Sequence, residues 1–493
     1  MIATEPRAAV ELRKRMRKPQ RHRLLHGYPL AAAMPTAEGV SPYHELRFDD
    51  GNGRGLLVGV LPHPFCNPAV SGCGFCTFPH EPGNAAKTTA VVKSVTGEVR
   101  RMEEFLFRGL WQRKVTGLYF GGGTANLCEP ESFRELCQAL AESFDLKDAE
   151  VTLEGVPAYF LRGSPWLLDV MRETLGARHY RVSMGIQTFD ADRLKQMGRT
   201  AFGTPHTFRE VVRVAHALGY TASADLLFDL PGQTLAEMRA DVQKAIDLGL
   251  DHAGLYHLVL FAGLGTAWAD DDDLLAGLPD NDRAAGNWRD LRGLMLAGDF
   301  VQTSLTNFER KDVHVTAKRF VYEDSGFRPD EFEIIGFGPS ALSYIASRDF
   351  SSGVKVMNPT TAEGYTKAIR ENARVWDKAF AYGPRDQRLL WLTRRLARLE
   401  LPRDRYRSLF GADMLDDFSE EFEAIRGAGL VEVTTDAVRP TPTGMFFADS
   451  ITAVLASPVL AANRAEQLDG KRRALDPALL ADTRENDNSF GHM

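Results

Sequence analysis

Short apolar runs bounded by Gly or Pro recur between residues 56 and 260 and predict β-strands. Segments between them repeat apolar residues at helical spacing and carry helix-start signals such as Ser164-Pro165 and Thr234-Leu235-Ala236-Glu237. Six strand–helix units in a row predict a parallel sheet with right-handed crossovers, either open or closed into a barrel, with its active site at the C-terminal strand ends. The expected strands are 56–61, 115–120, 150–153, 180–186, 221–228 and 253–260.

The remaining segments follow other patterns. Residues 1–23 are rich in Arg and Lys, which is typical of a solvated, partly helical arm. Residues 385–460 read as helix, helix, hairpin and final helix, which fits either a winged-helix-like domain or a plain helical cap. We therefore expect a basic arm and substrate-entry segment at 1–50, a barrel at 51–310, a connecting region at 311–384, the mostly helical domain at 385–460 and a flexible tail at 461–493.

The amino-acid composition is that of a globular protein and excludes several other classes. The 493 residues are 44% hydrophobic and 25% charged, so the chain has enough apolar residues for a sizeable core. The net charge of −7 and acidic residues in the predicted winged region disfavour a nucleic-acid partner. The sequence contains no run of 18 apolar residues, so no membrane-spanning helix is expected. The basic N-terminus lacks the apolar stretch of a secretory signal. Five cysteines do not make a disulfide scaffold, so we expect a reducing, cytoplasmic location.

Three of those cysteines share one short segment after the first predicted strand. Cys66, Cys73 and Cys76 have the spacing C-x6-C-x2-C, which can hold three corners of a metal site. With His63 or His80 as a fourth ligand the segment would suit zinc, and with an open corner it would suit a [4Fe–4S] cluster. Cys128 and Cys137 are expected to be ordinary packing residues, because Cys137 lies on an apolar helix face.

Further motifs follow the later strands in order: Tyr119-Phe120-Gly121-Gly122-Gly123-Thr124, Leu153-Glu154, Ser183-Met184-Gly185-Ile186-Gln187-Thr188-Phe189, Met197-Gly198-Arg199, and the run from Asp225 to Thr234. Together with the cysteine segment they resemble the radical S-adenosylmethionine (SAM) superfamily, in the branch of oxygen-independent coproporphyrinogen III oxidase (HemN-like). The resemblance spans about residues 20 to 460. It implies a partial (β/α)6 TIM-like barrel with an N-terminal extension and a mostly helical, winged-helix-like C-terminal domain.

The resemblance also implies cofactors. Cys66, Cys73 and Cys76 would hold the [4Fe–4S] cluster, SAM would bind its open iron, and a flavodoxin or ferredoxin would supply the electron that cleaves SAM to a 5′-deoxyadenosyl radical. Glycines allow the backbone to approach SAM closely. Carboxyl and amide oxygens can accept hydrogen bonds from the hydroxyl and amine groups of SAM. An arginine can pair with the carboxylate of SAM. The expected cofactor-binding residues are Phe75, Gly121, Gly122, Gly123, Thr124, Glu154, Gln187, Arg199 and Asp225.

Departures from the branch guide the functional expectation. The cysteine segment has three more residues between Cys66 and Cys73 than the usual C-x3-C-x2-C, and Phe78 stands where the porphyrinogen enzyme has a fourth cysteine. We therefore expect a class C methylase or cyclopropanase that uses two SAM molecules on a small-molecule natural product, with a companion methyltransferase as a further partner. Tetrapyrrole enzymes, which decarboxylate a porphyrinogen or degrade haem, and a haem-trafficking chaperone are the alternatives. Candidates for substrate or proton handling are His26, Tyr28 and Asn307.

Overall fold

Strands and helices alternate in the structure in the order that the sequence predicts. The computed structural model describes residues 5–21, 27–37, 53–66, 73–78, 80–105, 114–371 and 375–469. The predicted bounds of the second and fifth strands match the structure, and the others shift by one to three residues. The first six strands are β1 (Gly55–Val60), β2 (Val115–Phe120), β3 (Glu150–Gly155), β4 (His179–Gln187), β5 (Thr221–Phe228) and β6 (His252–His257).

Helices follow these strands, and Thr234 starts one as predicted. The helix expected to start at Ser164-Pro165 begins two residues later, at Leu167, with Trp166 as its N-cap. Thr204 and Thr234 each form a capping box at the start of a helix, because their hydroxyls accept from the backbone N–H three residues later. The helices are α3 (Ala85–Phe105), α4 (Pro130–Ser143), α5 (Leu167–Leu175), α6 (Ala191–Gln196), α7 (Pro205–Ala217), α8 (Leu235–Asp247), α9 (Asp272–Ala276) and α10 (Asn281–Ala297). All of these helices except the short α9 have buried apolar residues.

Twelve of the described strands make one sheet, in the order β12-β11-β10-β9-β1-β2-β3-β4-β5-β6-β8-β7. Strands β1 to β6 are parallel neighbours, and β9 adds a seventh parallel strand beside β1. The expected connecting region therefore contributes to the sheet itself. The added strands are β7 (Phe300–Gln302), β8 (Asn307–Arg310), β9 (Phe332–Phe337), β10 (Leu342–Ala346), β11 (Gly353–Met357) and β12 (Lys378–Tyr382).

Four short helices and strands complete this region and the start of the next. They are α11 (Lys311–His314), α12 (Tyr322–Gly326), α13 (Ala362–Arg370) and β13 (Leu401–Pro402). Helix α12 packs against β1, β2 and β9. The backbone N–H groups of Val321 and Tyr322 donate to the buried carboxylate of Glu150 at the start of β3, which fixes α12 at this end of the parallel strands.

The C-terminal part has the predicted order of helices around a hairpin. Strand β15 pairs with both β14 and β13, which makes a small antiparallel sheet among the helices. Helix α14 is buried along most of its length, so it forms the core of this region. The elements are α14 (Pro384–Ala397), α15 (Arg403–Phe410), α16 (Met414–Asp417), α17 (Ser419–Gly427), β14 (Val431–Val433), β15 (Ala437–Pro440), α18 (Pro442–Phe446) and α19 (Ala448–Leu468).

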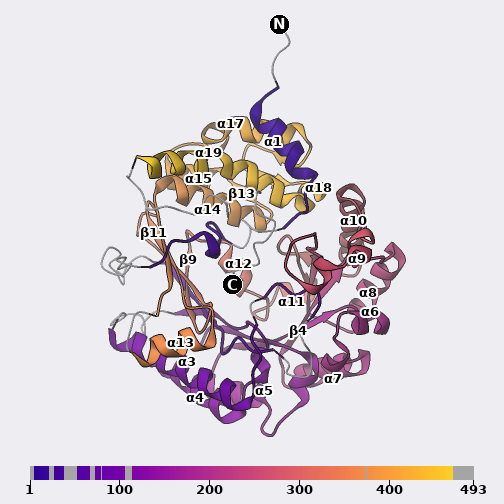
Figure 1. Cartoon of the computed structure of the whole chain (residues 1–493), viewed down its shortest axis with the longest axis vertical. Helices are drawn as coiled ribbons and strands as arrows, with labels where there is room; N and C mark the ends of the chain where they lie inside the picture. Colours follow the sequence, from indigo (N-terminus) through magenta and orange to yellow (C-terminus); the bar gives the residue numbers. More distant parts are fainter. Residues whose placement is uncertain are drawn as a thin grey trace.

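The basic N-terminal arm is docked rather than solvated. Helix α1 (Arg7–Met16) lies beside α17 and α19 (Figure 1). Leu12 is 1% exposed, and the backbone N–H of Ala8 donates to Glu420 Oε1 at 3.1 Å. The prediction of a partly helical arm is confirmed, but the prediction that solvent surrounds it is wrong, because the charged residues leave one apolar face that packs on the C-terminal helices.

One buried carboxyl holds the loop between β9 and β10. Glu98 of α3 accepts from the Gly338 backbone N–H at 2.8 Å, from Asn358 Nδ2 at 2.9 Å and from the Tyr365 hydroxyl. Burial raises the pKa of Glu98 to about 7 although these hydrogen bonds oppose the shift. Gly338 passes so close to the backbone of Leu61 that no side chain fits there. Glu98 therefore secures the junction of β1 and β9.

Glu98→Ala should destabilise the protein, because it leaves three buried donors without an acceptor. We expect a loss of roughly 2–5 kcal/mol in the free energy of unfolding, measured by urea denaturation. Glu98→Gln should lose much less, because an amide oxygen still accepts and the size is unchanged. Glu142→Ala, an exposed change on α4, is the control. Equal stability of the Glu98→Ala and Glu142→Ala variants would refute this account.

Candidate functional site

A cavity of about 370 Å³ opens among the C-terminal ends of the parallel strands. It gathers residues from five motifs that lie up to 150 positions apart in the sequence. Most of the predicted cofactor residues and one of the predicted substrate residues line it: Phe75, Gly121, Gly122, Glu154, Gln187, Asp225 and Asn307. Cys76, predicted as a cluster ligand, lines it as well.

Other predicted residues lie elsewhere. Tyr28 is fully buried away from the cavity, where its hydroxyl donates to Asp386 Oδ1 at 2.8 Å and accepts from Asn463 Nδ2 at 3.0 Å. These contacts join the N-terminal segment to α14 and α19, so the expectation that Tyr28 handles substrate or protons is corrected to a packing role. His26 lies outside the described residues. Thr124 is 2% exposed and does not line the cavity.

The cysteine segment lies against the glycine motif. Gly123 passes so close to the end of β1 that a Cβ atom there would stand 2.8 Å from the carbonyl oxygen of Phe65, the residue before Cys66. Gly122, at φ +85°, packs equally tightly on Leu61. From the sequence, we expected these glycines to let the backbone approach SAM. In the structure, Gly122 and Gly123 also bring the cysteine segment and β2 together.

All three predicted ligands are free cysteines with partly buried side chains. The backbone N–H of Cys76 donates to the Cys73 carbonyl at 3.0 Å in a tight turn. Burial raises the pKa of the Cys76 thiol to about 12, and the nearby Cys73 and Cys66 raise it further. Iron would reverse that trend, because a cation stabilises neighbouring thiolates. This donor set of three clustered thiols fits an iron–sulfur cluster.

The two histidines considered as zinc ligands are held in other ways. His63 is buried, stacks on Phe65 and accepts from its backbone N–H at 3.2 Å. Burial lowers the pKa of His63 to about 4. His80 lies 3.0 Å from the carbonyl of Phe78. Within the described ranges, no group of three or more His, Cys, Asp or Glu residues has the geometry of a metal-ion site.

Arg199 contacts the cysteine segment rather than the cavity. Its Nη1 atom lies 3.1 Å from Cys73 Sγ, and its Nη2 atom donates to the carbonyl of Gly185. The guanidinium also lies over the ring of Phe202 at 4.4 Å. We predicted that Arg199 would pair with a carboxylate of SAM. The structure places its guanidinium beside the Cys73 thiol instead.

A group of charges lies in the middle of the cavity. Tyr119 of β2 donates to Glu154 Oε2 at 3.0 Å, and Arg181 of β4 is buried nearby. Desolvation, followed by repulsion from Glu154, raises the pKa of Asp225 to about 7, although Arg181 opposes it. The sequence analysis missed Tyr119 and Arg181. Both could have been predicted, because alternate side chains of a strand point to the same face. Tyr119 lies two positions before Gly121, and Arg181 lies six positions before Gln187.

The end of β4 is strained where it meets the cavity. Gln187 has φ +71°, which is unusual for a residue other than glycine, and the register with β5 shifts between Gly185 and Gln187. The Gln187 side chain lines the cavity, as do those of Arg181 and Ser183 on the same strand. Strained backbone of this kind is concentrated at binding sites, which supports Gln187 as a functional residue.

The deep end of the cavity is also charged, and three of its groups come from beyond the six-strand unit. Asn307 of β8 and Ser304 hold Glu323 of α12, whose pKa is raised to about 7 by desolvation. Arg394 of α14 reaches the same cavity and is 8% exposed. The sequence analysis named Asn307 but missed Glu323 and Arg394, because the short helix and the buried face of α14 carried no recognised motif.

Comparisons with known proteins agree with this geometry. No protein-family model matches the chain. The heme chaperone HemW of Lactococcus lactis is 26% identical over 317 residues, which are 63% of this chain and 74% of that protein. The anaerobilin synthase of Escherichia coli O157:H7 is 31% identical over 238 residues, about half of each chain. The solved structure of E. coli coproporphyrinogen III oxidase (HemN) superposes with a TM-score of 0.70 and 19% identity, covering 87% of this chain and 96% of that one, and confirms the fold.

The chain therefore resembles radical SAM proteins of the HemN-like branch. These likenesses agree with the expectation of a [4Fe–4S] cluster, SAM, a small-molecule substrate and an electron donor. The expectation of a natural-product methylase or cyclopropanase is wrong, because these relatives carry names that concern haem and porphyrins. That expectation rested on the longer cysteine spacing, which changes the segment over the cluster without specifying a substrate. None of the described helices is long and apolar enough to cross a membrane.

The raised pKa of Asp225 makes the stability of this chain depend on pH. A carboxyl whose pKa is raised on folding stabilises the protein below its unfolded pKa near 4, and that stability is lost as the pH rises towards about 7. Asp225→Asn should therefore gain about 2–3 kcal/mol relative to the parent between pH 5 and pH 8. Urea unfolding without SAM at the two pH values measures the difference. The same pH dependence in both proteins would contradict the assignment.

Gly123→Ala should impair cluster assembly, because the new methyl group displaces the backbone of Phe65 and with it Cys66. We expect the variant to fold but to retain clearly less iron than the parent after anaerobic reconstitution, measured by iron content and visible absorbance. Gly293→Ala in α10, where nothing lies within 4 Å of the added carbon, is the matched control. Full iron content in the Gly123→Ala variant would rule out the proposed coupling.

Proposed function

We propose that this protein is a radical SAM enzyme that acts on a tetrapyrrole. The observation that carries the proposal is the cavity, which joins the cysteine segment and the SAM-type motifs to a charged inner end. A site that places a cysteine of the segment beside the polar groups at the strand ends suits SAM cleavage and hydrogen abstraction better than simple transport. The names of the relatives supply the substrate class, since they concern haem or porphyrins.

Each group in the cavity has a role in this proposal. Cys66, Cys73 and Cys76 would hold the cluster, which supplies the electron that cleaves SAM when both are bound. Gln187 and the carboxyls of Glu154 and Asp225 would accept hydrogen bonds from the hydroxyl and amine groups of SAM.

The inner end of the cavity serves the substrate. Asn307 and Glu323 would bind polar groups of the tetrapyrrole that project towards them. Arg394, at the same end, would attract an acidic substituent of the substrate.

The test is turnover by anaerobically reconstituted protein. Protein, SAM and a low-potential reductant are incubated separately with haem and with a porphyrinogen, and 5′-deoxyadenosine and tetrapyrrole products are measured by mass spectrometry. We expect SAM cleavage coupled to the change of one tetrapyrrole, and loss of both activities in Cys76→Ser. SAM cleavage that leaves every tetrapyrrole unchanged would overturn the proposal.

The number of SAM molecules is a separate part of the proposal. Phe75 and Gly121 line the cavity beside Cys76, and we assign a second SAM molecule to the backbone there. Equilibrium dialysis with labelled SAM should give about two molecules per chain in the reconstituted protein. A ratio of one would remove the second site and leave the substrate class untouched.

A haem-trafficking chaperone is the second candidate. The match to HemW favours it, because it covers 74% of that protein. Tight binding of one haem per chain without SAM cleavage would support this candidate against the enzyme. Haem binding with coupled turnover would support the enzyme.

A further inference from the structure

A tryptophan outside the recognised motifs covers the turn between two of the predicted cluster ligands. The backbone N–H of Trp268, in the segment after β6, donates to the carbonyl of Gly74 at 2.9 Å. The centre of its ring lies 5.7 Å from that of Phe75, with an angle of 60° between the ring planes. Gly74 and Phe75 are the two residues between Cys73 and Cys76. Trp268 therefore contacts both residues that separate these two ligands.

The contact at Gly74 is so close that it requires a glycine. A Cβ atom on Gly74 would stand 2.2 Å from both the Cδ1 and the Nε1 atoms of the Trp268 ring. Trp268 itself is 5% exposed, so little of its side chain faces water. The missing side chain at position 74 and the large one at position 268 thus fit one another, as in the close packing of a protein interior.

The tryptophan belongs to an apolar cluster that is separate from the main core. The buried members of the cluster are Met197, Leu230, Leu258, Leu260, Phe261, Leu264, Trp268 and Ala269. Phe75 packs against them from the cysteine segment. Met197 stands two positions before Arg199, whose Nη1 atom lies 3.1 Å from Cys73 Sγ. The cysteine segment is therefore held both by the motif of Arg199 and by the segment after β6.

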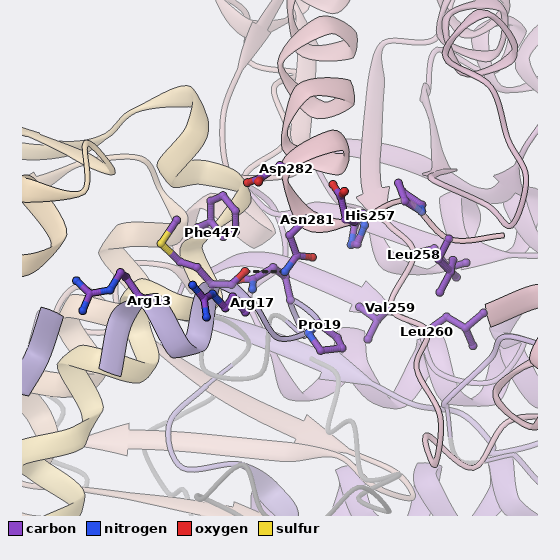
Figure 2. Close-up of a pocket in the computed structure, with 15 residues that line it drawn as sticks. Arg13, Arg17, Pro19, His257, Leu258, Val259, Leu260, Asn281, Asp282 and Phe447 are labelled. Atoms are coloured by element: carbon purple, nitrogen blue, oxygen red, sulfur yellow. Dashed lines mark hydrogen bonds between the residues drawn. The ribbon is translucent and has the colours of Figure 1, made fainter. Parts of the chain in front are cut away.

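Residues 258–260, at the start of the segment after β6, form the wall between two spaces. They line a pocket of about 560 Å³, which we call the outer pocket, and Leu258 and Val259 also line the cavity of the candidate site. Figure 2 shows the outer pocket between the end of α1, this segment and the start of α10. Arg13 and Arg17 line it from the N-terminal arm. The segment after β6 therefore lies between the arm and the site.

The N-terminal arm holds this wall in place. The guanidinium of Arg21 lies over the ring of Phe261, 3.9 Å from the ring centre. Asn281 Nδ2 donates to the carbonyls of Met16 at 2.7 Å and Lys18 at 2.8 Å, which ties the arm to α10. The tryptophan is thus presented to the cysteine turn by a segment whose own position is fixed.

Resting on the proposed function for the presence of the cluster, we propose that Trp268 is a positioning residue for it. The indole ring holds the turn between Cys73 and Cys76 closed and covers this side of the cluster against water and dissolved oxygen. The ring acts through packing, because the apolar shell around a metal site controls the access of solvent to it. Solvent exposure also affects the reduction potential of such clusters, so the cover bears on the electron that the proposed chemistry requires.

The first test needs no iron. Iron-free full-length protein is treated with iodoacetamide, and the labelling of each cysteine is followed by mass spectrometry. Trp268→Ala should raise the labelling rates of Cys73 and Cys76 several-fold. Cys137, which is fully buried on α4, should stay unlabelled and reports global unfolding. Trp268→Phe should keep most of the protection, because an aromatic ring still covers the turn. Leu278→Ala, which removes apolar packing against the same cluster beside the outer pocket, is the matched control and should label like the parent.

The second test pairs Trp268 with Gly74 in reconstituted protein. Gly74→Ala should retain less iron than the parent, because the added methyl group and the indole ring cannot both fit. The double variant Gly74→Ala/Trp268→Ala should recover part of that iron, since the second change makes room for the first. Trp268→Ala alone should take up iron anaerobically but lose its visible absorbance in air about tenfold faster than the parent, as expected for a residue that shields a metal site. Trp268→Phe should restore most of the stability in air.

Parent-like labelling of Cys73 and Cys76 in Trp268→Ala would overturn the inference, as would an increase that Cys137 shares equally. A double variant with no more iron than Gly74→Ala would overturn it too. If the parent takes up no iron, the proposed function fails, whereas the labelling rates still decide whether Trp268 covers the turn.

Discussion

The close passage of Gly123 over the carbonyl of Phe65 is the contact on which the site depends. It brings the end of β1, and hence the first cysteine, against the loop that follows β2. Cys76 and Gly121 then share one cavity with the ends of β3, β4 and β5. A side chain at position 123 would separate these two segments, so the backbone itself decides whether the cysteines and the strand-end polar groups can act together.

Desolvation governs the chemistry of the residues gathered there. Asp225 and Glu323 have raised pKa values because they face a cavity rather than bulk water, and Arg181 offsets part of this effect. Opposite charges that lie close together in such a site can still form hydrogen bonds with a ligand. Arg394 is a buried guanidinium of the C-terminal region that lines the same cavity, although the rest of the site is built mainly on the sheet.

Much of this could be predicted from the sequence. Strand periodicity located β1 to β6, and the order of motifs at their ends located Glu154, Gln187 and Asp225, because parallel strands bring their carboxyl ends to one edge. The strands β9 to β12 escaped prediction, since short strands beside glycines carry little periodic signal. Glu323 and Arg394 escaped because their positions depend on long-range packing, and Tyr28 was misassigned because a buried tyrosine has no local sequence mark. The proposed substrate class rests on the names of the relatives and not on the cysteine spacing.

The anchoring of the arm by Asn281 and by the C-terminal helices has a consequence for biogenesis. The outer pocket combines residues near the start of the chain with Phe447, so its walls are separated by more than four hundred positions in the order of synthesis. A nascent chain can form the first strand–helix units early, yet it must wait for its last helices before the arm has a surface to dock on. The outer pocket is therefore complete only in chains that have been translated almost to the end.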